Sequence, residues 1–175
     1  MFFDKFIKKE NKNYFENKDI IYLSVHYISV LRNLIIKMYE QSDDPISKGY
    51  MSKSNLNYTM EYVKEMYNDS ENKKEKLRKK AAFIFYNITS KHPFSDGNKR
   101  TAIIACNSFL EYNGYTIGNL PFNESYKFIT SVAKCNKTEL DCQNFIQKHI
   151  SKLVVSEELK KEIIKMQQDL NKNEE

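Results

Sequence analysis

Two strongly apolar segments, separated by a short polar turn, constrain the fold of this chain more than any other feature. Ala81–Ile88 (AAFIFYNI) and Thr101–Tyr112 (TAIIACNSFLEY) would be apolar on most faces of a helix. A helix that is apolar all round is buried, so both segments are expected at the centre of the domain. Ser90–Asp96, which contains Pro93, is expected to form the turn between them. The chain is therefore predicted to build its core on two adjacent central helices.

The remaining sequence predicts an all-α fold around this pair. Apolar residues recur at spacings of three and four, which is the periodicity of an amphipathic helix. Including the central pair, helices are predicted over about 19–41, 58–67, 75–89, 97–113, 123–134 and 138–150. Asp19 is a candidate N-cap of the first helix, Thr138 and Glu139 are expected to start the last, and Gly114 stands where a left-handed residue ends a helix. The sequence shows no alternation typical of β-strands and no internal repeat.

The chain is expected to form one domain with a short extension at each end. Its 175 residues, 41% of them hydrophobic, suit a single domain with a sizeable core. Residues 1–18 are predicted as an N-terminal arm, 19–150 as the catalytic domain and 151–175 as a polar C-terminal helix or tail. An a/d-like stripe follows this last helix, formed by Leu159, Ile163, Met166 and Leu170. The stripe would either fold onto its own domain or dock a partner.

Composition narrows the classes of function. No apolar run reaches the roughly 18–20 residues of a membrane-spanning helix, and the N-terminus lacks the apolar core of a signal peptide. A membrane is therefore not expected as a partner. Three cysteines are too few for a disulfide framework, which favours a cytoplasmic location. The 28 basic residues exceed the 23 acidic ones, giving a net charge of +5. The excess is mostly scattered lysine, so nucleic acid is not expected as a partner.

The turn between the central helices, K-H-P-F-S-D-G-N-K-R-T, concentrates the chemically active residues. The start of a helix favours anions such as phosphate, because its first N–H groups are unpaired and lie at the positive end of the helix dipole. Gly97 allows a ligand oxygen close to the backbone, and Asn98 can donate a hydrogen bond. Lys99 adds a charge. Arg100 offers a rigid fork for phosphate oxygens, in a chain with only three arginines beside 25 lysines.

His92 and Asp96 add acid–base and metal chemistry to this anion site. Asp96 supplies a hard oxygen ligand, and Mg²⁺ is usually held by one or two carboxylates together with nucleotide phosphates. His92 has the side chain best suited to act as a general base near neutral pH. Phe94 alternates with these two residues and is expected to point into the core. Together the residues indicate transfer of a phosphorus-containing group from a nucleotide to a hydroxyl.

Simpler interpretations apply to each residue alone. The turn could be an ordinary connection in which Asp96 caps the next helix. A zinc site at His92 and Asp96 is weakly supported, because no further histidine or cysteine ligand lies nearby in the sequence. The whole chain could be a non-catalytic helical module with a vestigial anion site that binds a partner or RNA. The joint pattern, more than any single residue, favours an enzyme.

The run His92–Thr101 (HPFSDGNKRT) resembles the active-site motif of the Fic/Doc (Fido) family, whose general form is H-x-F-x-[D/E]-[G/A]-N-[G/K]-R. Every defining position is filled, and the following TAIIACNSFLEYNGY is similar to the Doc (death-on-curing) branch. The resemblance implies an all-helical Fido-type bundle with the motif loop between two central helices. It also implies a small β-hairpin flap beside the site. Residues 46–56 are the candidate segment, and an ordinary surface loop is the alternative there.

The resemblance implies a role for each matched residue. His92 would deprotonate the target hydroxyl, and Asp96 would bind Mg²⁺. The ATP phosphates would be held by Gly97, Asn98, Lys99 and Arg100. The partner would be a target protein with a Ser, Thr or Tyr hydroxyl. No segment fits the family's inhibitory motif, so restraint would come from an antitoxin-like inhibitor in trans, if at all, with a toxin–antitoxin pair as the setting.

The exact group transferred is left open by two opposing features. Lys99 replaces the second glycine of the adenylylating motif, and Ile103 stands where that motif has a second arginine. Both changes are similar to Doc-type toxins, which transfer the γ-phosphate of ATP. The pair Asp96-Gly97, in contrast, resembles the adenylylating form. Phosphorylation of a protein hydroxyl is slightly favoured, and adenylylation (AMPylation) is the alternative.

Overall fold

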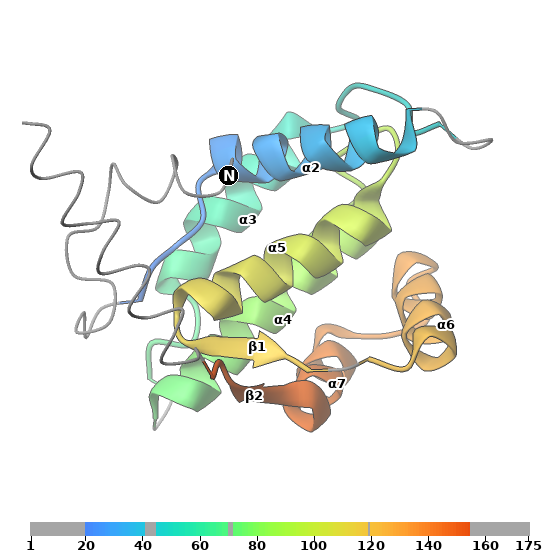
Figure 1. The fold of residues 1–175 in the computed structure, drawn as a ribbon. Coiled ribbons are helices and arrows are strands. Elements are labelled where there is room, and N and C mark those ends of the chain that lie inside the picture. The colour runs from blue at the N-terminus through green and yellow to red at the C-terminus, as the bar shows by residue number, and fades with distance from the viewer. Residues whose placement is uncertain (1–19, 41–44, 70–71, 119, 155–175) are drawn as a thin grey trace, which may run out of the picture.

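The computed structural model describes residues 20–40, 45–69, 72–118 and 120–154, which form a helical bundle with one small sheet (Figure 1). The helices are α2 (Val25–Tyr39), α3 (Lys53–Glu65), α4 (Lys73–Lys91), α5 (Asn98–Tyr112), α6 (Phe122–Ala133) and α7 (Glu139–His149). The strands are β1 (Tyr115–Ile117) and β2 (Ile150–Lys152). The predicted mainly helical fold is confirmed. The predicted N-terminal arm and the C-terminal stripe lie outside the described residues.

The core lies between α4 and α5, the two helices that the apolar segments predicted. Helix α4 packs against α3, α5 and α7, and α5 also contacts α2 (Figure 1). Ile88 on α4 and Phe109 on α5 are fully buried. Each buried side chain of this size contributes roughly 1.5–3 kcal/mol to folding. No helix in the described ranges is long and apolar enough to cross a membrane.

Side-chain caps decide where four of these helices begin. Ser24, Ser52, Asn72 and Thr138 each accept a hydrogen bond from the N–H three residues further on. The prediction of Thr138 as a helix start is confirmed. Asp19 was wrong as the first cap, because Ile20–Ser24 precede the helix and Ser24 caps it. The helix predicted from Tyr58 begins earlier, at Lys53, because Ser52 caps a polar first turn that has no apolar period.

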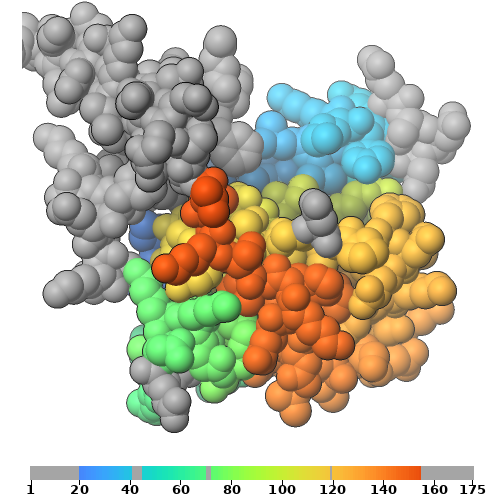
Figure 2. Space-filling model, turned by 60° about the horizontal axis from the view of Figure 1, so that its bottom comes forward, coloured from blue at the N-terminus to red at the C-terminus, as the bar shows by residue number. Residues whose placement is uncertain are grey.

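A small antiparallel sheet joins the end of α5 to the end of α7, and the sequence did not predict it. Its register pairs Tyr115 with Lys152 and Ile117 with Ile150. Gly114 ends α5 in the left-handed region (φ +82°), as predicted, and its carbonyl accepts from Leu153 N at 3.0 Å. Figure 2 shows α7 and β2 on the surface next to the end of α3 and the start of α4. The sheet therefore fastens the last described segment to the core.

The flap predicted over residues 46–56 does not form a hairpin. Its last four residues, from Lys53, already belong to α3, and Tyr50 forms a single β-bridge with Phe94. The backbone of this segment finds its partners in the motif loop instead of in a second strand. The segment is therefore a loop fastened to the motif.

Candidate active site

The motif loop connects α4 to α5, as the sequence predicted. His92 is the C-cap of α4 with φ +43°, and Gly97 is the N-cap of α5 with φ +76°. Both residues lie in the left-handed region, which is uncommon for a residue other than glycine. Two left-handed residues five positions apart turn the chain sharply between the two helices.

Phe94 and Asn98 close the loop from within. Asn98 Nδ2 donates to the carbonyl of Phe94 at 2.8 Å, and Phe94 N donates to Asn98 Oδ1 at 3.0 Å. Phe94 is fully buried, as predicted, and Asn98 is 7% exposed. The side-chain amide of Asn98 thus holds the loop itself, which leaves its backbone N–H at the start of α5 for a ligand.

A buried arginine on α2 contacts the motif loop and holds it in place. Arg32 Nη2 donates to the carbonyl of Ser47 at 2.6 Å and lies 3.5 Å from that of Asp96. Its guanidinium lies over the Phe94 ring, 4.7 Å from the centroid. Burial lowers the pKa of Arg32, and negative charge at Tyr50 and Asp96 opposes that shift. Arg32 therefore ties α2 to both the motif loop and the segment before α3.

The segment before α3 holds the other side of the loop. Ser95 Oγ donates to the carbonyl of Lys48 at 3.1 Å. Met51 N and Ser52 N both donate to the carbonyl of Pro93, at 2.9 and 3.0 Å. The motif backbone is therefore fixed on both sides before any ligand is bound.

His92 is exposed, and its ring is oriented by α6. Its Nε2 lies 3.2 Å from the carbonyl oxygen of Ala133. A carbonyl oxygen only accepts, so Nε2 carries the hydrogen in this contact, and in the neutral imidazole Nδ1 is then the atom with the lone pair. An exposed histidine with a set tautomer is suited to accept a proton from an incoming hydroxyl.

The first turn of α5 has no side-chain cap. Helices α2, α3, α4 and α7 are capped by side chains, whereas Gly97 leaves the first N–H groups of α5 without such a partner, as Pro121 does for α6. A Cβ added to Gly97 would lie 3.2 Å from Ile46 Cγ2. Glycine is therefore required here by its positive φ and by the close approach of Ile46.

The two cations of the motif lie over tyrosine rings. Lys99 Nζ is 5.7 Å from the centroid of the Tyr126 ring, on α6. The guanidinium carbon of Arg100 is 4.2 Å from the centroid of the Tyr39 ring, on α2. Among the residues that the structure describes, no carboxylate forms a salt bridge with either cation. Their positive charge is therefore available to an anion beside the first turn of α5.

A protein-family model described as the Fic/DOC family matches residues 14–110, which are more than half of the chain and include the whole motif. The chain belongs to the Fic/DOC family. No match is found among curated proteins. Fic/DOC proteins are generally enzymes that transfer nucleotide or phosphate groups, with ATP as the substrate. The predicted resemblance is thus confirmed at the level of the family.

In this Fic/DOC protein, Asp96 is the candidate metal ligand that the sequence predicted. Its Oδ1 accepts from the N–H of Gly97, and it forms no salt bridge within the described ranges. The same ranges contain no group of three His, Cys, Asp or Glu that could hold a metal by themselves. A single hard carboxylate beside an anion site fits Mg²⁺, which takes its other ligands from phosphates and water. It does not fit zinc, which needs three or four protein ligands.

Three residues that contact the motif lie outside the pattern that the sequence offers: Arg32, Tyr39 and Tyr126. Arg32 and Tyr39 lie seven residues apart, two turns along one side of α2, and both contact the motif. Their contacts join segments more than 60 residues apart, so no local pattern reveals them. The signal that could have found Arg32 is the scarcity of arginine, since two of the three arginines contact this Fic/DOC motif or belong to it.

Proposed function

We propose that this chain is an ATP- and Mg²⁺-dependent transferase that modifies a Ser, Thr or Tyr hydroxyl of a target protein. Phosphoryl transfer of the Doc type is slightly favoured. The observation that carries the proposal is the start of α5, which has no side-chain cap. It lies beside an exposed histidine and two cations that form no salt bridge with a carboxylate of the described residues. This arrangement offers positive charge and N–H donors to phosphate at one point and a base at another.

Each residue of the site has a separate role in the proposed reaction. The N–H groups at the start of α5 and the Arg100 guanidinium bind and orient the phosphates of ATP. Asp96 would hold Mg²⁺, whose charge would neutralise the phosphate oxygens. His92 Nδ1 takes the proton from the target hydroxyl as its oxygen forms a bond to the γ-phosphorus. The bond from that phosphorus to the bridging oxygen breaks, and ADP leaves.

Lys99 and Ile103 favour phosphoryl transfer over adenylylation. The side chain of Lys99 extends over Tyr126 and occupies space where the adenylylating motif has glycine. Ile103 stands where the adenylylating motif has its second arginine, so α5 lacks that arginine to bind the phosphates. The side chain of Ile103 is partly buried against the main core instead. Gly97 after Asp96 supports the alternative, in which His92 activates the hydroxyl toward the α-phosphorus, AMP is transferred and pyrophosphate leaves.

The proposed setting is a cytoplasmic toxin–antitoxin pair. The sequence holds no segment that fits the family's inhibitory motif. An exposed base, and two cations without a salt bridge to any described carboxylate, would leave the site open to ATP. An antitoxin-like protein that covers the site in trans would supply the missing restraint.

The position of a radioactive label in ATP tests which group is transferred. We would incubate the full chain with a cell lysate, Mg²⁺, and ATP labelled either at the γ- or at the α-phosphate. Phosphorylation labels a protein band only from γ-labelled ATP, and adenylylation labels it only from α-labelled ATP. The control is His92→Asn, because asparagine tolerates the left-handed backbone but is not a base.

Each outcome has a defined meaning. Label from γ-labelled ATP that disappears with His92→Asn supports the proposed function. Label from the α-position instead supports adenylylation. The non-catalytic binding module is favoured if neither label is transferred and the chain also fails to bind ATP. A steep salt dependence of RNA binding would then identify RNA as its partner.

A further inference from the structure

The Arg100 guanidinium is held in a different way from the chain's other two arginines. Arg78 donates to both carboxylate oxygens of Glu75, and Arg32 donates to the backbone carbonyl of Ser47. Arg100 lies over the ring of Tyr39, 4.2 Å from its centroid, with no salt bridge among the described residues. A ring beneath the face of a guanidinium leaves its N–H groups free, since these point outward in the guanidinium plane.

Tyr39 is itself fixed against the motif. It is the last residue of α2 and packs on a small cluster of Ile35, Ile36 and Ile46. Ile46 is also the residue that a Cβ at Gly97 would meet. One apolar cluster therefore contacts both the start of α5 and the ring that carries Arg100. Figure 1 shows the C-terminal end of α2 close to the beginning of α5.

We propose that Tyr39 is a positioning residue that holds the Arg100 guanidinium so that its N–H groups face the phosphates of ATP. This inference rests on the proposed function and adds a residue to its binding site. A free arginine side chain loses considerable rotamer freedom when it binds an anion. Stacking on a fixed ring restricts that freedom before the anion arrives, so less is lost on binding. Tyr39 acts only through Arg100 and does not itself touch the nucleotide.

A double-mutant cycle tests this inference, with affinity for ATP in the presence of Mg²⁺ measured by isothermal titration calorimetry. We expect Arg100→Ala to weaken ATP binding about 10- to 100-fold. Tyr39→Leu should weaken it about 3- to 10-fold, and Tyr39→Phe, which keeps the ring, less than about twofold. In the Arg100→Ala background, Tyr39→Leu should have no further effect, because its partner is already gone.

The matched control is Tyr58→Leu, which removes an exposed tyrosine that stacks on Tyr62 of α3 and does not contact the motif. Its ATP affinity should equal that of the wild type. Thermal unfolding of each variant shows whether it is folded, and Tyr39→Met, which keeps apolar bulk at the cluster, replaces Tyr39→Leu if the latter unfolds.

The outcomes separate this inference from the proposed function. Failure of the wild type to bind ATP, or an Arg100→Ala variant that binds as tightly as the wild type, would overturn the ATP site and the inference with it. If Arg100→Ala weakens binding and Tyr39→Leu does not, only the role of Tyr39 is overturned. The same holds if Tyr39→Leu weakens binding equally in both backgrounds, or if Tyr39→Phe behaves like Tyr39→Leu.

Discussion

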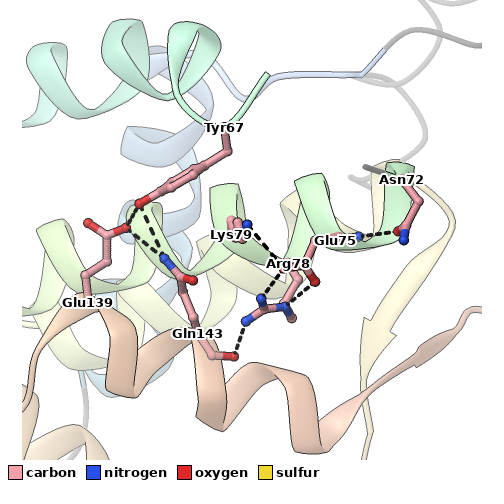
Figure 3. A network of polar contacts seen from close by, with 7 residues as sticks. All are labelled: Tyr67, Asn72, Glu75, Arg78, Lys79, Glu139 and Gln143. Atoms are coloured by element: carbon pink, nitrogen blue, oxygen red, sulfur yellow. Dashed lines mark hydrogen bonds and ion pairs between the residues drawn. The ribbon is translucent and has the colours of Figure 1, made fainter. Parts of the chain in front are cut away.

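The polar network that joins α4 to α3 and α7 uses its charged groups differently from the motif loop. Arg78 donates to both carboxylate oxygens of Glu75 and, at 2.9 Å, to the carbonyl of Gln143 (Figure 3). Tyr67 donates to Glu139, whose Oε1 also accepts from Gln143 Nε2 at 3.3 Å. Burial and the Glu139 carboxylate raise the pKa of Tyr67, so this phenol keeps its proton. Each charged group of this network is therefore held by an ion pair or by hydrogen bonds from neighbouring side chains.

In the motif loop the backbone is held by hydrogen bonds, whereas the two cationic side chains remain available to a ligand. Its carbonyls and amide side chains bond to one another and to Arg32. Lys99 and Arg100 face tyrosine rings, and among the described residues neither has a carboxylate partner. A charge that is already paired within the protein stabilises the fold but attracts a charged ligand only weakly. The paired charges of the network suit a role in stability, whereas the charges of the loop suit the ATP binding that we propose.

The largest expected effect is on transfer, from His92→Asn. We expect the rate of label transfer to fall about 10²- to 10⁴-fold, because the general base is lost. ATP affinity and the unfolding temperature should stay close to the wild type, since His92 is exposed and its ring forms a hydrogen bond only with the Ala133 carbonyl among the described residues. Measuring transfer, ATP binding and thermal unfolding on the same preparation checks this. A large loss of stability would instead assign His92 to the fold.

Arg78→Met should break the paired region and leave the motif intact. It removes a buried guanidinium and leaves the Gln143 carbonyl without its donor, which should lower the free energy of unfolding by about 2–3 kcal/mol. Transfer activity of the folded protein should not change. The matched control is Lys79→Met, whose more exposed ion pair with Glu75 at 3.3 Å should be worth less than about 0.5 kcal/mol. Urea unfolding measures both, and equal effects would contradict the distinction.

The helices were predictable from sequence because their apolar faces repeat locally. The central pair and the end of α5 at Gly114 were predicted closely. Starts were less predictable. Ser52 caps a helix with a polar first turn, and the apolar spacing of Ile20 and Leu23 continues ahead of the helix that Ser24 caps. The strands β1 and β2 were missed because three residues are too few to show alternation and their partner lies more than 30 residues away.

The candidate site was predictable only in its local part. His92 to Arg100 form a contiguous motif, so residue types and spacing were enough to indicate phosphate chemistry. The supports on α2 and α6 were not visible, because Tyr39 and Tyr126 reach the motif through tertiary packing. The internal bonding of the Asn98 side chain was also hidden, since an amide suits a loop closure as well as a ligand.

Gly97→Ala and Gly114→Ala compare two glycines with similar positive φ, +76° and +82°. Both substitutions should cost about 1–2 kcal/mol of unfolding free energy, because the left-handed region is unfavourable for alanine. Gly97→Ala should cost about 1 kcal/mol more, since its Cβ meets Ile46, whereas nothing lies within 4 Å at Gly114. Only Gly97→Ala should reduce transfer. Chemical denaturation and the label assay measure the two effects, and equal loss of activity in both would show that Gly97 has no special role at the motif.

Lys80 offers a third case, a fully buried cation that donates to backbone carbonyls and lies over the Tyr22 ring, 5.2 Å from its centroid. Its Nζ donates to the carbonyls of Val63 and Lys64 at 2.7 and 3.0 Å, at the end of α3. Burial lowers the pKa of Lys80 to about 8; nearby Lys76 adds to this shift and Glu65 opposes it. An unfolded chain releases this proton near pH 10.5. Between these values the unfolded state binds more protons, so stability from this site rises with pH.

The measurement is the difference in unfolding free energy between the wild type and Lys80→Met, taken by urea denaturation from pH 7 to 9.5. Methionine cannot donate to the two carbonyls, and that loss does not depend on pH. The difference should be constant below pH 7.5 and then grow in favour of the wild type by at least about 1 kcal/mol at pH 9.5. Titration of groups that do not interact with Lys80 cancels in the subtraction. A difference that is flat over the whole range would show that the carbonyls stabilise the charged ammonium as well as water does, and that the end of α3, like the Arg78 network, fully satisfies its cation.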